Sequence, residues 1–183
     1  MRGISGEGRL TGNYIDSVGF ETGFIYDRYG FRSVLYPNSD STDVWDTAPD
    51  GLMVGDWSDV AGNIYGYSLR AGQFRSLNVP GAASVTSIRG INAQHIMVGV
   101  FDDATGALHG FARTADGHYI QLDAPGAAVT FTNRINNQDA IVGFYQGTDG
   151  AAHGYLLTGW QQLPRIAAPA GGSHLQGARA FLD

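Results

Sequence analysis

Apolar and polar positions alternate over short stretches of this chain, most clearly between residues 85 and 128. Alternation with a period of two predicts β-strands, and the stretches end at Gly, Asp or Pro, which favour turns. No stretch keeps the 3.6-residue period of an amphipathic helix. The pattern therefore predicts four short strands joined by hairpins, at residues 85–91, 96–101, 107–113 and 118–122.

The same pattern occurs four times, at intervals of 43 or 44 residues. A Gly-x-aromatic step marks each copy at Gly12, Gly55, Gly99 and Gly143. A Gly-aromatic step follows at Gly23, Gly66, Gly110 and Gly154. A repeat of this length is a supersecondary unit that buries its apolar face only by stacking on its neighbours. We expect one repeat domain, with units at approximately residues 1–41, 42–84, 85–128 and 129–171, followed by residues 172–183.

Four short antiparallel strands in about 44 residues are typical of a propeller blade. The sequence thus predicts an all-β protein, a four-bladed β-propeller built from four four-stranded repeats. Unit one lacks most of its first strand, whereas residues 172–183 have the pattern of a surplus one. Pairing of the N- and C-terminal segments would close the ring and remove two free strand edges. An open array of four units is the alternative.

Composition narrows the range of partners. The 183 residues carry a net charge of -6, and all 11 basic residues are Arg. Nucleic acid and anionic membranes require a basic surface, so neither is expected as a partner. No Cys is present, which excludes disulfides, and no apolar run approaches the ~20 residues of a spanning helix. The first 30 residues contain no apolar core of a signal peptide, so we expect a soluble chain.

Units three and four resemble a known repeat family. The segments that carry the resemblance are Gly90–Gln94, Ile96–Gly99, Leu108–Phe111 and Leu122–Ala127, with Ile135–Gln138 and Ile141–Gly143 in unit four. They are similar to the HAF-type extracellular repeats of bacterial proteins, which are named for a His-Gly-Phe-like tripeptide. His109-Gly110-Phe111 and His153-Gly154-Tyr155 match that tripeptide. The resemblance implies a repeat β-protein, often secreted, and carries over no catalytic residues.

Metal and cofactor sites are not expected. His109 and His153 occupy equivalent positions in different units, too far apart to share one ion. The Asp-rich turns at residues 102–106 and 148–150 lack the carboxylate spacing of a calcium loop. Asp and Gly at such positions are explained by tight-turn geometry. The chain also has no phosphate-binding loop, nucleophile elbow or zinc-protease motif.

Candidate site residues are found where the repeats differ, because packing favours similar residues in each unit. Aligning on Ile4, Ala48, Ile91 and Ile135, the position two residues earlier holds Arg2, Asp46, Arg89 and Asn133. If the first strand of each unit is innermost, these side chains line the axis, and Arg134 adjoins them. Together they would orient a polar ligand, or hold a carboxylate with a perturbed pKa. A structural Arg–Asp network that fills the channel is the alternative.

The loop after unit one is the second such difference. Units two and three have small apolar residues there, whereas residues 37–45 include Asp40, Asp43 and Trp45. We interpret these three residues, with Asp46, as a candidate site on the face where propellers commonly bind ligands. Exposed polar residues without a function are the alternative explanation.

Three functions are compatible with this pattern. We favour a binding module for a small molecule, glycan or peptide at one end of the propeller axis. The first alternative is a small enzyme (a lyase, cyclase, isomerase or hydrolase) that uses Asp46, Asp43 and a nearby Arg or Tyr as acid and base. The second is a structural repeat domain that joins larger partners, and self-association into a homo-oligomer is compatible with all three.

Overall fold

The structure is a computed structural model, which describes residues 1–166. Unit one contains β1 (Gly3–Ile4), β2 (Leu10–Ile15), β3 (Glu21–Asp27) and β4 (Gly30–Val34). Unit two contains β5 (Ser41–Thr47), β6 (Met53–Ser58), β7 (Ile64–Arg70) and β8 (Gln73–Ser76). Unit three contains β9 (Thr86–Ile91), β10 (Met97–Asp102), β11 (Leu108–Arg113) and β12 (Tyr119–Leu122). Unit four contains β13 (Ala127–Ile135), β14 (Ile141–Gly147) and β15 (Ala152–Leu157), followed by the 3-10 turn η1 (Trp160–Gln162).

Each unit is an antiparallel sheet whose strands pair in chain order. The all-β prediction is confirmed, and the strands of unit three lie within one residue of their predicted bounds. A parallel contact between Glu21 and Ser41 joins units one and two, and a parallel contact between Ile64 and Val85 joins units two and three. The first of these contacts joins units one and two into one hydrogen-bonded sheet.

Unit four differs from the predicted four strands, because only three are present among the described residues. In place of a fourth strand, the chain turns at Gly159, which has a φ of 70°, into η1. The Trp160 indole is buried there and donates to the Asp139 carbonyl oxygen at 2.8 Å. Pro164 follows and has no N–H for a strand ladder. The Ile166 amide instead donates to the carbonyl oxygen of Tyr119 in unit three, at 2.6 Å.

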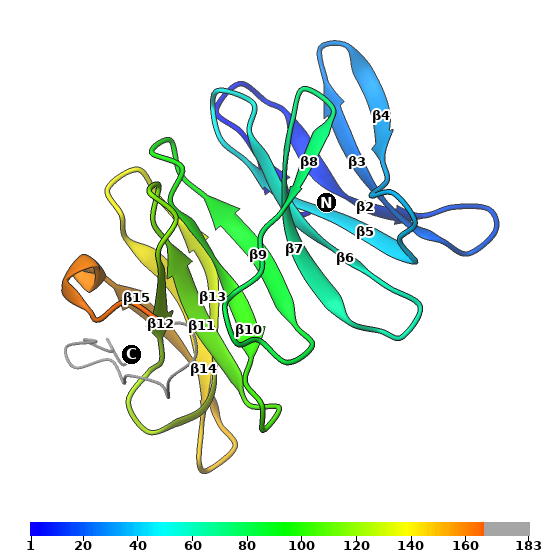
Figure 1. Cartoon of the computed structure of the whole chain (residues 1–183). Coiled ribbons are helices and arrows are strands. Elements are labelled where there is room, and N and C mark those ends of the chain that lie inside the picture. The colour runs from blue at the N-terminus through cyan, green and yellow to red at the C-terminus, as the bar shows by residue number, and fades with distance from the viewer. Residues whose placement is uncertain (167–183) are drawn as a thin grey trace.

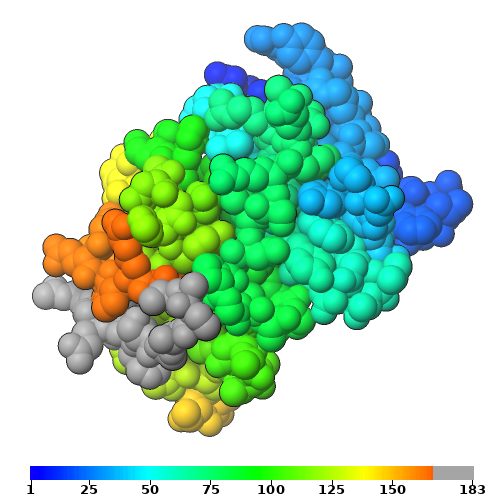
Figure 2. Space-filling model, viewed as in Figure 1, coloured from blue at the N-terminus to red at the C-terminus, as the bar shows by residue number. Residues whose placement is uncertain are grey.

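Three apolar clusters hold the four units together face to face. The cluster between units one and two includes Ile25, Val44 and Tyr67. Larger clusters lie between units two and three and between units three and four. Figure 1 shows the units following one another through the molecule, and Figure 2 shows them as successive colour bands on the surface. Stacking of repeats therefore provides the core.

A glycine on each third strand allows the next unit to approach closely. A Cβ atom on Gly23, Gly66 or Gly110 would lie 2.8–2.9 Å from a side-chain carbon of the following first strand. The residues contacted are Val44, Ile88 and Thr132, at intervals of 44 residues. A Cβ on Gly154, the equivalent in unit four, would meet nothing within 4 Å among the described residues.

The outer face of unit four is correspondingly uncovered. Val142 and Leu156 are 45% and 42% exposed, whereas Val98 and Ala112, their equivalents in unit three, are 0% exposed. Between residues 1 and 166 no strand ladder joins unit four to unit one, so a closed four-bladed ring is not shown. The segment predicted to close it, residues 172–183, lies outside the described residues.

Candidate functional site

The first strands of the four units meet at the centre of the molecule, which we call the hub. The strands β1, β5, β9 and β13 contact one another in this order, and Arg134 of β13 donates to the Arg2 carbonyl oxygen. Three of these strands carry a β-bulge, where one residue has no partner on the second strand. A bulge bends the strand and redirects its extra side chain.

The bulged residues are Trp45, Arg89 and Asn133. They are spaced by 44 residues, and Arg2 precedes Trp45 by 43. The hub set is therefore Arg2, Trp45, Arg89 and Asn133, and the sequence alignment that placed Asp46 in it is wrong by one residue. The error came from aligning Ala48 with Ile91. Turn hydrogen bonds instead make Ala48 equivalent to Asn92, since each accepts from the amide three residues later.

Consecutive hub side chains contact one another. The Arg2 guanidinium carbon lies 4.0 Å from the Trp45 ring centre, and that of Arg89 lies 4.9 Å from it. Arg89 also donates to the Asn133 side-chain oxygen at 3.1 Å. A cation near an indole ring is favourable, more so where water is excluded. The four units thus contribute four dissimilar side chains to one connected cluster.

Two carboxylates lie beside this cluster. Asp43 and Asp56 are directly opposite each other on β5 and β6. The Trp45 indole donates to the Asp56 carboxylate at 2.8 Å, and the Ser87 hydroxyl donates to the same oxygen. Arg2 forms an ion pair with Asp43, with 3.5 Å between Nε and Oδ1. Asp43 and Asp56, both in unit two, therefore bond side chains of units one and three.

Burial makes ionisation of both carboxyl groups unfavourable. Burial raises the pKa of Asp56 from 3.8 to about 7, against hydrogen bonds from Ser87 and Trp45, while the Asp43 charge raises it further. Burial also raises the pKa of Asp43, although the Arg2 charge opposes that shift. Asp56 is therefore a proton donor and acceptor near neutral pH.

Asp46 and Arg134 form the next layer. The Asp46 carboxylate accepts from the amides of Thr47, at 2.9 Å, and Ile91, at 3.2 Å. Burial raises the Asp46 pKa, opposed by these two hydrogen bonds and by the Arg134 charge. Arg134 donates to the carbonyl oxygens of Arg89, Arg2 and, at 2.7 Å, Asn133. Both side chains therefore also connect units.

A hollow of about 500 Å³ opens at the hub, and we call it the axial hollow. Residues from all four units line it. Arg2 lines the axial hollow and also contacts the Trp45 ring of the hub set. Its polar lining includes Arg2, Asp46, Arg134, Asn136, Asn137 and Gln138, and its apolar lining includes Ile4, Pro49, Ile91 and Ile135.

The structure separates one predicted residue from the others. Residues 37–45 were predicted as a loop, but β5 begins at Ser41, because Thr42 and Val44 alternate into the core and are 0% exposed. Asp43, Trp45 and Asp46 are therefore strand residues near the hub. Asp40 stays in the preceding loop, exposed, with its amide bound to the Ser58 carbonyl oxygen at 2.8 Å.

Asp56 and Ser87 were not identified from the sequence. A signal for Asp56 was present, because the equivalent positions in units three and four hold Val100 and Phe144. Unit one holds Asn13 at this position, so the four repeats differ here as they do at the first-strand positions.

Two negative findings apply to the described part of the chain. Residues 1–166 contain no group of three or more His, Cys, Asp or Glu side chains placed to hold a metal ion. The same residues include no helix long and apolar enough to cross a membrane. No protein-family model matches the sequence, and a search of curated proteins gave no match.

Proposed function

We propose that this protein is a binding module for a small polar molecule, glycan or peptide, held in the axial hollow. The observation that carries the proposal is a hollow of about 500 Å³ that residues of all four units line, with Arg2, Asp46 and Arg134 among them. This volume is within the range typical of small-molecule sites. Units that differ at the hub while sharing their packing residues are expected when the hub has a role beyond packing.

The chemistry of the axial hollow favours a hydroxyl- or amide-rich ligand. Asn137 and Gln138 offer amide donors and acceptors, Arg2 offers a guanidinium, and Ile4, which is 66% exposed, offers an apolar surface. Sugars and short peptides present this mixture of polar edges and apolar faces. Arg2 and Arg134 bring two guanidinium groups to the lining and Asp46 brings one carboxyl group. Arg134 already donates to three carbonyl oxygens.

We also propose that the four units close into a propeller. Gly154, Val142 and Leu156 form a face that in units two and three is covered by the following unit. The repeat intervals of 43 and 44 residues lead from Thr132 to Leu175 and Gln176, so this segment stands where the series Val44, Ile88, Thr132 would continue. We propose that residues 172–183 supply the strand that covers this face and closes a four-bladed ring.

Ligand screening with matched variants tests the binding proposal. Thermal-shift screening against mono- and oligosaccharides and short peptides is expected to yield a stabilising ligand. Asn137→Ala and Gln138→Ala are expected to abolish the shift, and Asp16→Ala, in an exposed turn of unit one, to leave it unchanged. If Asp46→Ala, Asn137→Ala and Gln138→Ala lower the melting temperature but leave ligand binding intact, the hub is a structural network.

An acid–base enzyme is the second candidate, and Asp56 is the observation that favours it. A carboxyl group with a pKa of about 7 opposite a second carboxyl group has the properties of a general acid or base. Arg2 links the pair to the axial hollow. Asp56→Asn should abolish turnover of a ligand found by screening while leaving its affinity nearly unchanged. If the wild type shows no turnover between pH 5 and 9, the enzyme alternative is excluded and only the binding proposal remains.

A further inference from the structure

A second hollow, which we call the rim hollow, lies between units two and three. Its volume is about 530 Å³, similar to that of the axial hollow. The β7–β8 hairpin forms one wall, and the turn before β10 and the end of β11 form the other. The turn Asn92–Ile96 separates the two hollows, because Ala93 lines the axial one and His95 the rim one.

Three arginines and one histidine surround the rim hollow. Arg70, Arg75, Arg113 and His95 all line it. Arg70 is paired with Asp50 at 2.6 Å, whereas no carboxylate of the described residues lies within 4.0 Å of Arg75 or Arg113. The buried Nε of Arg113 also has no hydrogen-bond partner among those residues. In a chain with 17 acidic and 11 basic residues, two arginines without carboxylate partners in one hollow call for an explanation.

Arg113 departs from the repeat pattern. The equivalent third-strand positions of units two and four hold Leu69 and Leu157, which are 5% and 3% exposed in the cores between units, and unit one holds Tyr26, which is 50% exposed. Packing therefore favours an apolar residue at this position, and unit three has a guanidinium there instead. A departure of this kind is expected where a ligand supplies the missing partner.

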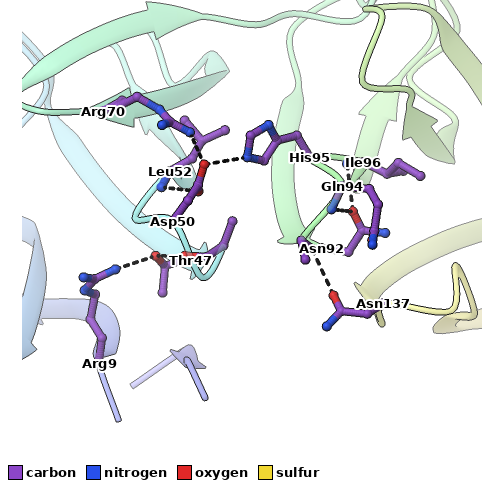
Figure 3. A network of polar contacts seen from close by, with 12 residues as sticks. Arg9, Thr47, Asp50, Leu52, Arg70, Asn92, Gln94, His95, Ile96 and Asn137 are labelled. Carbon is purple, nitrogen blue, oxygen red and sulfur yellow. Dashed lines mark hydrogen bonds and ion pairs between the residues drawn. The ribbon is translucent and has the colours of Figure 1, made fainter. Parts of the chain in front are cut away.

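A network on the rim holds two further groups in place (Figure 3). Asp50 accepts from Arg70 at 2.6 Å and bonds the His95 ring at 2.9 Å. Burial opposes ionisation of Asp50, but hydrogen bonds from Arg70, the Leu52 amide and His95 outweigh it and lower the pKa to about 2. Asp50 is therefore a permanent anion that fixes Arg70 and His95 beside the hollow.

His95 adopts a backbone conformation that favours glycine. Its φ is 62°, and the equivalent turn positions in units one and two hold Gly8 and Gly51, with φ of 78° and 87°, whereas unit four holds Asp139, with φ of 61°. A non-glycine residue in this region is uncommon, although His is among the types that tolerate it. The chain thus keeps an imidazole at the rim at a small conformational cost.

The floor of the rim hollow is apolar. Leu77 and Met97 are 6% and 3% exposed, and Leu52 and Phe74 complete the floor. We propose that the rim hollow binds a small organic oxyanion, a carboxylate or phosphate monoester, whose apolar portion rests on this floor. Arg75 and Arg113 bind the anionic group, because guanidinium donors match carboxylate and phosphate oxygens in pairs.

Titration calorimetry with three probes tests the proposal. Phenyl phosphate and benzoate are expected to bind saturably. Inorganic phosphate should bind at least roughly tenfold more weakly than phenyl phosphate, because it makes no contact with the apolar floor. Raising the salt concentration should weaken binding, since the contact is ionic. Tighter binding of phenyl phosphate than of benzoate would identify the ligand as a phosphate monoester, and the reverse order as a carboxylate.

Two variants and a control complete the experiment. Arg113→Leu restores the residue of the neighbouring units and should fold, yet raise the Kd of phenyl phosphate at least about tenfold. Arg75→Gln, on the exposed β8, should raise the Kd of phenyl phosphate by a similar factor. If Arg113→Leu does not fold, this second variant tests the proposal. Arg28→Gln, in an exposed turn of unit one, should change nothing. Absence of saturable binding, or an equal loss in Arg28→Gln, would overturn the proposal.

Discussion

Asp56 is the residue whose charge state most strongly affects the hub. Its pKa rises from 3.8 to about 7 in the folded protein because the side chain is buried. Between these two values the folded state keeps a proton that the unfolded state has released. The free energy of unfolding must then fall as pH rises through this window, and the stabilising contribution is greatest below pH 4.

Asp56→Asn is expected to remove this pH dependence. The amide oxygen can still accept from Trp45 and Ser87 and carries no charge at any pH. At pH 8 the variant should therefore be more stable than the wild type, by on the order of 2–4 kcal/mol, and the difference should vanish near pH 4. Urea denaturation from pH 4 to 8 measures both quantities. Parallel wild-type and variant profiles would show that Asp56 titrates normally.

Individual residues also show where sequence reasoning succeeds and fails. Arg2, Arg89 and Asn133 could be predicted as neighbours because they recur at the repeat interval in a first strand, and the structure joins them through Trp45. The alignment of Asp46 with Arg2, Arg89 and Asn133 was wrong by one residue, because sequence alignment does not reveal the bulge at Trp45 or the hydrogen bonds of the following turn. Asp46 nevertheless lines the axial hollow. Asp56 accepts a hydrogen bond from Ser87 of unit three, and no pattern near either residue in the sequence indicates this contact.

At the scale of the elements, the third-strand glycines determine how closely successive units pack. The first strand of each unit passes over the preceding third strand at a distance that excludes a methyl group. A Cβ on Gly110 would lie 2.5 Å from the Leu122 carbonyl oxygen and 2.8 Å from the Thr132 methyl group. The backbone oxygen cannot move without disturbing the β11–β12 pairing, so the sheets themselves would have to separate.

Gly110→Ala should therefore destabilise the protein by about 1–3 kcal/mol, the usual cost of overpacking a close-packed interior. Gly6→Ala is the matched control, because a Cβ there meets nothing within 4 Å and its φ is not in the left-handed region. The control should be neutral or slightly stabilising. Chemical denaturation of both variants gives the comparison, and equal stabilities would mean that units three and four are less tightly packed than described.

At the scale of the whole molecule, the repeat length and the hairpin pattern were sufficient to predict an all-β chain of four stacked units. Ring closure could not be derived in the same way. It depends on whether the uncovered face of unit four is covered by the same chain, by a second copy or by neither. Intervals of 43 and 44 residues from Thr132 lead to Leu175 and Gln176, within residues 172–183, which supports the same chain.

A double-mutant cycle between Gly154→Ala and removal of residues 172–183 tests the closure. If the C-terminal segment covers Gly154 as Thr132 covers Gly110, the substitution should cost about 1–3 kcal/mol in the full chain and almost nothing in the shortened one. The coupling energy, measured by chemical denaturation, then reports contact between residues far apart in sequence. A neutral substitution in both backgrounds would mean an open array. Coupling that grows with protein concentration, with a dimer in sedimentation, would instead place a second copy on this face.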